Sequence, residues 1–152
     1  VTTQLAPYSI AVTPPGLPPV VAANPKREAV IDIDQTFVGT TAEITTNILR
    51  TALGAQTGVQ IADLHMVIRY VHVWLAPTIG SADSVTLEDP VFNTRSTGDS
   101  SNTVRARAGF FYPKNVQRHM GPSVPGTTSV ASLESSTQDI AYTARIGVTY
   151  WL

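Results

Sequence analysis

The chain has 152 residues, enough for one folded domain and too few for two full ones. Of these residues 43% are hydrophobic and only 14% are charged, and the ten basic residues are balanced by eleven acidic ones, so no overall basicity points to a nucleic-acid partner. The absence of cysteine excludes disulfides, thiolate metal sites and a cysteine nucleophile, and no apolar run reaches the ~18 residues that a membrane-spanning helix needs.

Residues 1–27 predict an extended, proline-rich N-terminal arm. Six prolines fall between positions 7 and 25, and each removes a backbone donor and fixes one backbone angle. Apolar side chains lie between the prolines, so we expect the arm to lie along a surface of this chain or of a neighbouring copy. The remaining residues, 28–152, are expected to form one domain.

Alternation of apolar and polar residues predicts strands in most of the domain. The predicted strands cover residues 28–38, 64–76, 84–92, 103–112, 127–133 and 139–152. Turn-forming residues predict a polar loop over 93–102 and a long loop over 113–126. Together these elements predict an all-β fold, an antiparallel β-sandwich, with its strand order left open between jelly-roll, immunoglobulin-like and other arrangements.

One short helix interrupts the strands. Thr40 and Glu43 have the spacing of a capping box, and the apolar residues that follow fall on one helical face. Gly54 is the expected end of this helix.

The strand over 64–76 is apolar on both faces and is therefore expected at the centre of a sheet. Regular alternation places His72 and Trp74 together on one face and His65 on the other, so the two histidines are not expected to share a metal ion. Trp74 is interpreted as a packing residue near the strand end, where Pro77 stops the strand.

Asp32 and Asp34 share a face of the first predicted strand. Two interpretations stay open for them: a solvated face or interface salt bridge, and a divalent cation bound at a subunit contact with carboxylates of a neighbouring copy. No other cofactor is expected.

Four basic residues are candidates for contact with nucleic acid. Lys26 and Arg27 lie where the arm enters the first strand, and Arg105 and Arg107 share a face of theirs. Positive groups on one surface can bind phosphates, although solvent-facing arginines would show the same pattern.

No catalytic motif is found. The loop over 97–102 has neither a nucleophile elbow nor a phosphate-binding glycine pattern, and His119 has no carboxylate close in sequence to orient it as a base. The sequence therefore predicts that the protein is not an enzyme.

The order of features over residues 28–118 resembles the coat proteins of small icosahedral plant RNA viruses. The matching residues are Val71, Val73 and Trp74 before Pro77, the segment 97–100, the segment 105–113, and Asn115, Gln117 and Arg118. The resemblance implies a single jelly roll that self-assembles into a closed shell around a single-stranded RNA genome. Its implied partners are copies of itself and the genome, without a membrane, and its implied location is the virion.

That family commonly carries a strongly basic N-terminal arm, which these residues lack. Either such a segment precedes Val1, or the genome is bound through the four basic residues above, or the cargo differs. A low content of charged residues and an apolar, proline-rich arm are typical of a subunit that buries neutral surface on assembly.

The alternative function is a β-sandwich ligand-binding module, lectin-like or adhesin-like. Its binding rim would be formed by the loops at 77–84, 93–102 and 113–126.

Overall fold

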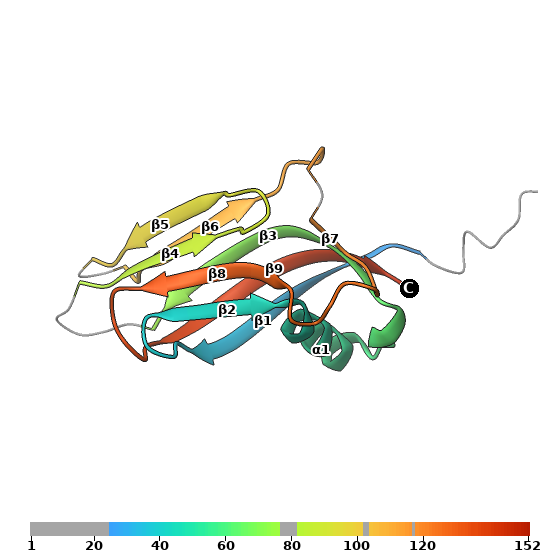
Figure 1. The fold of residues 1–152 in the computed structure, drawn as a ribbon, viewed down its shortest axis with the longest axis horizontal. Helices are drawn as coiled ribbons and strands as arrows, with labels where there is room; N and C mark the ends of the chain where they lie inside the picture. Colours follow the sequence, from blue (N-terminus) through green and yellow to red (C-terminus); the bar gives the residue numbers. More distant parts are fainter. Residues whose placement is uncertain (1–24, 77–81, 102–103, 117) are drawn as a thin grey trace, which may run out of the picture.

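The computed structural model describes residues 25–76, 82–101, 104–116 and 118–152, which form two antiparallel sheets packed face to face (Figure 1). The five-stranded sheet contains β1 (Arg27–Thr36), β9 (Ala141–Trp151), β3 (His65–Leu75) and β6 (Arg107–Phe111) in that order, with β7 (Arg118–Met120) also paired to β3. The four-stranded sheet contains β2 (Thr41–Thr45), β8 (Ser129–Ser135), β4 (Ser84–Glu88) and β5 (Arg95–Asp99) in that order.

The strand pairing is that of one long hairpin wrapped into a sandwich. β1 pairs with β9, β2 with β8, β3 with β6, and β4 with β5, all antiparallel, so the first half of the chain pairs with the second half in reverse order. Successive strands also pass between the two sheets, which gives the double Greek key of a jelly roll. The predicted all-β jelly-roll sandwich with one α-helix is confirmed, and residues 1–24 of the predicted arm lie outside the described residues.

The core lies between the sheets and is built by period-two alternation. In β9 every second residue faces the core, while the residues between point to the outer side, where Tyr70 and Arg69 cover Gly147 and Thr149. The inward residues of β9 are Tyr142, Ala144, Ile146, Val148 and Tyr150. Each large apolar side chain buried in this layer contributes about 1.5–3 kcal/mol to the free energy of unfolding.

Helix α1 (Thr46–Thr57) closes one end of the sandwich beside β1 and β2 (Figure 1), and its Leu49 and Leu53 are fully buried. Thr45 caps it by accepting a hydrogen bond from the Ile48 amide, and Gly58 ends it at a φ of 77°. Among the described residues no helix is long and apolar enough to cross a membrane.

The predicted helix start at Thr40 and end at Gly54 are wrong. Residues 41–45 form β2 instead, because Ala42 and Ile44 alternate inward and β8 supplies hydrogen-bond partners. The apolar spacing around Ile44 suits both a helix and a strand, and pairing with a distant strand decides between them.

Two short strands lie where loops are predicted. β5 is polar on its outer side and carries a glycine, and β7 has three residues, so neither shows the pattern of a strand in sequence. Each is held as a strand by its neighbour, β4 in one case and β3 in the other.

A β-bulge interrupts β3 at Arg69. Ile68 pairs with Val148 and Tyr70 with Gly147, so Arg69 has no partner residue in β9. The extra residue reverses the alternation: before it Met66 and Ile68 point inward, and after it the inward residues are Val71, Val73 and Leu75. The prediction that His65 and His72 face opposite sides is therefore wrong, and both lie on the outer face.

Close approach of β5 to β6 joins one edge of the two sheets and requires Gly98. A Cβ at this position would lie 1.6 Å from the backbone oxygen of Arg107. We predict that Gly98→Ala lowers the free energy of unfolding by at least about 1–3 kcal/mol, because two backbones would have to separate. Urea unfolding of the unassembled chain measures this change.

Thr97→Ala is the matched control, since Thr97 lies on the outward side of the same strand. This substitution is expected to lower the free energy of unfolding by about 0.5 kcal/mol. Equal unfolding midpoints for the two variants would contradict the role of Gly98.

Candidate functional site

The outward face of the five-stranded sheet carries a group of aromatic rings, which we call the aromatic face. Its members are His65, Tyr70, His72 and Trp74 of β3, Phe111 of β6, His119 of β7 and Trp151 of β9. All three histidines and both tryptophans of the chain belong to it. The rings therefore gather on one side of the molecule.

At one end of this face, three rings lie in mutual contact. His65 Nδ1 lies 3.2 Å from His119 Nε2, and the ring centroids of His65, His119 and Trp151 are 5.3–5.6 Å apart with planes within 7° of parallel. The Lys26 ammonium lies 4.8 Å from the centroid of the Trp151 ring. This end thus combines flat aromatic surface with a cation.

In the middle of the face, rings lie against the backbone of neighbouring strands. A Cβ on Gly147 would lie 2.1 Å from the Tyr70 ring, and a Cβ on Gly109 would lie 2.4 Å from the His72 ring. Phe111 contacts both rings with centroids 5.5 and 5.1 Å away, and it is 69% exposed. The two glycines leave the space that these rings occupy.

The other end of the face places cations beside rings. The Arg145 guanidinium lies 5.9 Å from the Trp74 ring, and His72, Trp74 and Arg107 line a hollow of about 390 Å³. Partial burial, together with the nearby Arg107 and Arg145, lowers the pKa of His72 below its usual 6.5. His72 is therefore neutral at neutral pH.

The predicted basic residues lie at the two ends of this sheet. Arg27 begins β1 opposite Tyr150, near Lys26, whereas Arg105 donates from Nε to the Leu75 oxygen at 2.6 Å and Arg107 pairs with Trp74 at the far end. Thr143 and Tyr150 of β9 lie beside these two ends, and the seven steps between them correspond to about 24 Å. The four residues therefore do not form one patch, and their contact with nucleic acid stays a prediction.

Asp32 and Asp34 share an outward face, as the alternation predicts. Asp32 accepts hydrogen bonds from Arg145 Nε at 2.8 Å and Nη2 at 3.1 Å, which lower the pKa of its carboxyl, and Asp34 accepts one from Thr143 at 2.7 Å. In the part of the chain that the structure describes, no group of three or more His, Asp or Glu could hold a metal ion. The salt bridge observed here lies within one chain, and a cation shared between subunits stays a prediction.

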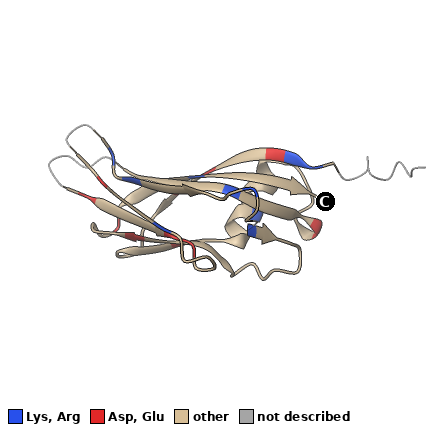
Figure 2. Cartoon of the chain, turned by 90° about the horizontal axis from the view of Figure 1, so that it is seen from above, with Lys and Arg blue, Asp and Glu red and all other residues tan. Residues whose placement is uncertain are grey.

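The outward face of the four-stranded sheet has the opposite character. Its charged residues are Glu43, Glu88, Arg95, Asp99 and Glu134, four carboxylates and one guanidinium, and the residues between them are mostly Thr and Ser. Three of the carboxylates line a hollow of about 470 Å³. Figure 2 shows the two layers edge-on and how few charged positions either one carries.

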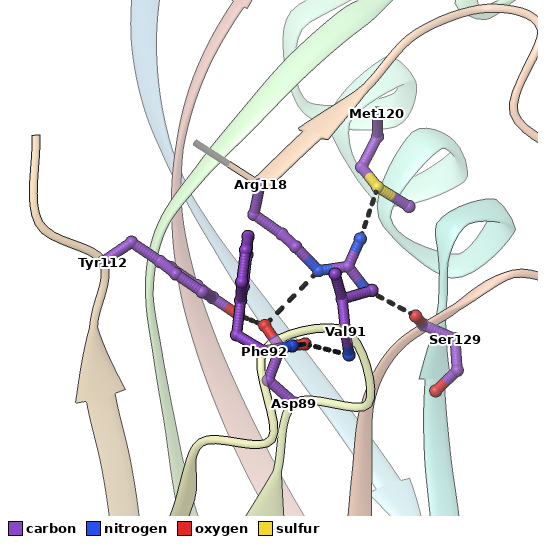
Figure 3. Close-up of polar contacts among 7 residues, drawn as sticks. All are labelled: Asp89, Val91, Phe92, Tyr112, Arg118, Met120 and Ser129. Atoms are coloured by element: carbon purple, nitrogen blue, oxygen red, sulfur yellow. Dashed lines mark hydrogen bonds and ion pairs between the residues drawn. The ribbon is translucent and has the colours of Figure 1, made fainter. Parts of the chain in front are cut away.

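A buried polar cluster links the ends of four strands (Figure 3). The Asp89 carboxylate accepts hydrogen bonds from the Tyr112 hydroxyl and from the backbone amides of Val91 and Phe92, and it forms an ion pair with Arg118 at 3.4 Å. Arg118 also donates to the Ser129 oxygen at 2.8 Å. Asp89 follows β4, Tyr112 follows β6, and Arg118 and Ser129 begin β7 and β8.

This cluster is built to hold the fold rather than to react. Asp89 is fully buried and Arg118 is 5% exposed, so a substrate does not reach them. Burial and the hydrogen bond to Asp89 raise the pKa of Tyr112 well above its usual value, so the phenol stays protonated as a donor.

Local sequence patterns signal neither arrangement, and the reasons differ. The aromatic face depends on the bulge at Arg69, although Arg145 and Trp151 already share the outward side of the predicted last strand. The pairing of Asp89 with Arg118 joins a predicted strand end to a predicted loop, and no local pattern signals it.

Breaking the buried pair is expected to be costly. Arg118→Met keeps much of the side-chain volume but leaves the Asp89 charge buried without its cation, which lowers the free energy of unfolding by about 3–5 kcal/mol. The double variant Asp89→Asn, Arg118→Met should recover part of this loss. Denaturant unfolding of the unassembled chain measures both.

Arg145→Met is the control for this experiment, because it breaks an ion pair whose side chains are about half exposed. Its destabilisation should be clearly smaller, since water solvates the remaining Asp32. An equal loss in the two arginine variants would show that burial of the Asp89 pair does not set its contribution.

The lowered pKa of His72 predicts a pH dependence of stability. As pH falls below 6.5, the unfolded chain binds a proton on this residue that the folded chain does not, so the free energy of unfolding decreases toward lower pH. The groups that face His72 are Arg107, Arg145 with its partner Asp32, and the rings of Tyr70, Trp74 and Phe111.

His72→Gln should therefore show a shallower loss of stability between pH 7.5 and pH 5 than the unchanged chain. Because His65 and His119 are kept in both proteins, the difference between the two unfolding curves reports His72 alone. Parallel curves would mean that the pKa of His72 is not lowered in the folded protein.

Comparison with known proteins gives a match at the level of structure. No family model matches the chain, and no curated protein matches it in sequence. The chain is similar to the virus-like particle structure of extra small virus of the giant freshwater prawn, Macrobrachium rosenbergii. The TM-score is 0.74 at 26% sequence identity, and the match covers 99% of this chain and 94% of that one.

Two weaker matches are also to virus structures. Desmodium yellow mottle tymovirus gives a TM-score of 0.48 at 12% identity, covering 93% of each chain. The empty particle of Kashmir bee virus at acidic pH gives 0.46 at 14% identity, covering 83% of this chain and 76% of that one. From the match to the virus-like particle, which spans nearly the whole chain, it follows that this protein has the fold of a virion capsid protein.

Proposed function

We propose that this chain is a structural capsid protein that assembles with copies of itself into the closed, icosahedral shell of a virion around a single-stranded RNA genome. The observation that carries the proposal is the match to the virus-like particle, with a TM-score of 0.74 over 99% of the chain. The wrapped-hairpin strand order supports it, because jelly rolls of this kind build viral shells.

The surface supports repeated self-association. Large apolar side chains are exposed at several separate places on the described part of the chain: Val30, Val38, Ile61, Val91, Phe92, Val104, Phe111 and Leu152. With only 14% charged residues, little charge has to be removed from water when copies meet. Symmetric assembly buries such surfaces on every copy at once.

Finer parts of the proposal rest on the sequence. Lys26, Arg27, Arg105 and Arg107 are proposed to face the genome, and Asp32 and Asp34 are proposed as carboxylates for a divalent cation at a subunit contact. The matching residues over 28–118 also predict a particular likeness to the coat protein of satellite tobacco mosaic virus. No catalytic step is assigned to the chain.

The full chain should form closed particles when it is produced without other viral components. Light scattering after size-exclusion chromatography measures the mass, and negative-stain microscopy shows the particles. Nucleic acid released from purified particles should be degraded by ribonuclease and resist deoxyribonuclease. A shell subunit is expected to give this result because its exposed apolar surface is covered only in the assembly.

A stable monomer at every concentration, with and without added RNA, would contradict the proposal. It would favour the alternative of a lectin-like or adhesin-like module, which has no need to self-associate. Particles that contain only DNA would keep the capsid role and remove the RNA genome.

A further inference from the structure

We propose that the aromatic face is the surface that binds the enclosed single-stranded nucleic acid, with bases stacked on its rings and phosphates held by Lys26, Arg69 and Arg107. The five-stranded sheet then faces the interior of the shell and the four-stranded sheet faces outward. This assignment deepens the proposed function and, for its place in a shell, rests on it.

The first support is the run of rings along β3. His65, Tyr70, His72 and Trp74 all point outward from this one strand, and the ten residues from His65 to Trp74 span about 30 Å. Stacking on aromatic side chains is tolerant of base identity, because every base has a flat π-face. A run of this length suits an extended strand of several nucleotides.

The second support is that cations lie between the rings. Lys26 lies over Trp151, and Arg107 lines a hollow with His72 and Trp74. Arg69 donates from Nε to Thr149 at 3.0 Å and lines, together with Tyr70 and Glu28, a second hollow of about 620 Å³. Stacking surface interleaved with positive charge is the arrangement by which proteins bind single strands without sequence preference.

The third support is the charge contrast between the two outward faces. The four-stranded sheet presents four carboxylates, one guanidinium and no aromatic ring among its strand residues, so it would repel a phosphate backbone. The outward side of the five-stranded sheet also carries three carboxylates, Glu28, Asp32 and Asp34. Four cations outnumber them there, Lys26, Arg69, Arg107 and Arg145, and Arg145 is already paired with Asp32. Charge complementarity therefore selects the five-stranded sheet for the nucleic acid.

The test measures binding of a 5′-fluorescein-labelled 20-nucleotide oligouridylate to the full chain, kept dilute so that it is unassembled. Fluorescence anisotropy gives the affinity. Since both tryptophans belong to the aromatic face, stacking of bases should also quench the intrinsic tryptophan fluorescence of the protein. Tryptophan emission that does not change on binding would overturn the proposal.

Variants of exposed residues locate the binding surface. Arg107→Gln should weaken binding about 3- to 10-fold at low salt and reduce the slope of log affinity against log salt by about 0.7. Phe111→Thr, which removes the most exposed ring, should weaken binding about 5- to 10-fold.

Arg95→Gln is the matched control, because Arg95 is an exposed arginine on the edge strand of the opposite sheet. It should leave the affinity and the salt slope unchanged. Unfolding curves that match the unchanged chain establish that each variant is folded.

The possible outcomes distinguish nucleic-acid binding at the aromatic face from binding of a second copy of the chain there, and they distinguish both from the capsid role. If Arg107→Gln and Phe111→Thr leave the affinity unchanged, or if Arg95→Gln weakens binding equally, the assignment is wrong. If Phe111→Thr prevents particle formation without changing the affinity, the face binds a second copy of the chain instead, which also overturns the assignment. If the unchanged chain forms no particles but both variants still lose affinity, the capsid role fails and the binding surface stands.

Discussion

The pairing of β3 with β9 is the interaction on which the rest of the structure depends. These two eleven-residue strands lie far apart in sequence and form an antiparallel ladder along nearly their whole length. β1 attaches to the free side of β9, while β6 and β7 attach to the free side of β3. The inward side chains of both strands then form one layer of the core, against which the four-stranded sheet and α1 pack.

Within this ladder, the bulge at Arg69 determines what the outer face presents. Arg69 is not left without hydrogen bonds: its backbone oxygen accepts from the Tyr112 amide at 2.9 Å and its side chain contacts Thr149. The reversed alternation keeps Met66 and Ile68 in the core on one side of the bulge and Val71 on the other. As a result His65, His72 and Trp74 lie on one surface, and that surface differs in chemistry from the acidic face of the opposite sheet.

Two ion pairs show how a chain with so few charges uses them. The buried pair of Asp89 and Arg118 fixes the ends of four strands, and Arg118 also donates to the Ser129 oxygen where β8 begins. The exposed pair of Asp32 and Arg145 joins β1 to β9 and neutralises a carboxylate beside the aromatic rings.

The sequence by itself determined which side of each regular strand faces the core, because alternation of apolar and polar residues has the same period as the strand. This pattern predicts that Ile31 and Ile33 face the core while Asp32 and Asp34 face outward, and it also predicts which residues of β9 face the core. The structure confirms both predictions. Only the tertiary structure decided the strand order, the polar strand β5, the true start of α1, the bulge at Arg69 and the burial of Asp89 against Arg118. Each of these depends on a partner that is distant in the chain, and local periodicity carries no information about which distant segment supplies the hydrogen bonds or the opposite charge.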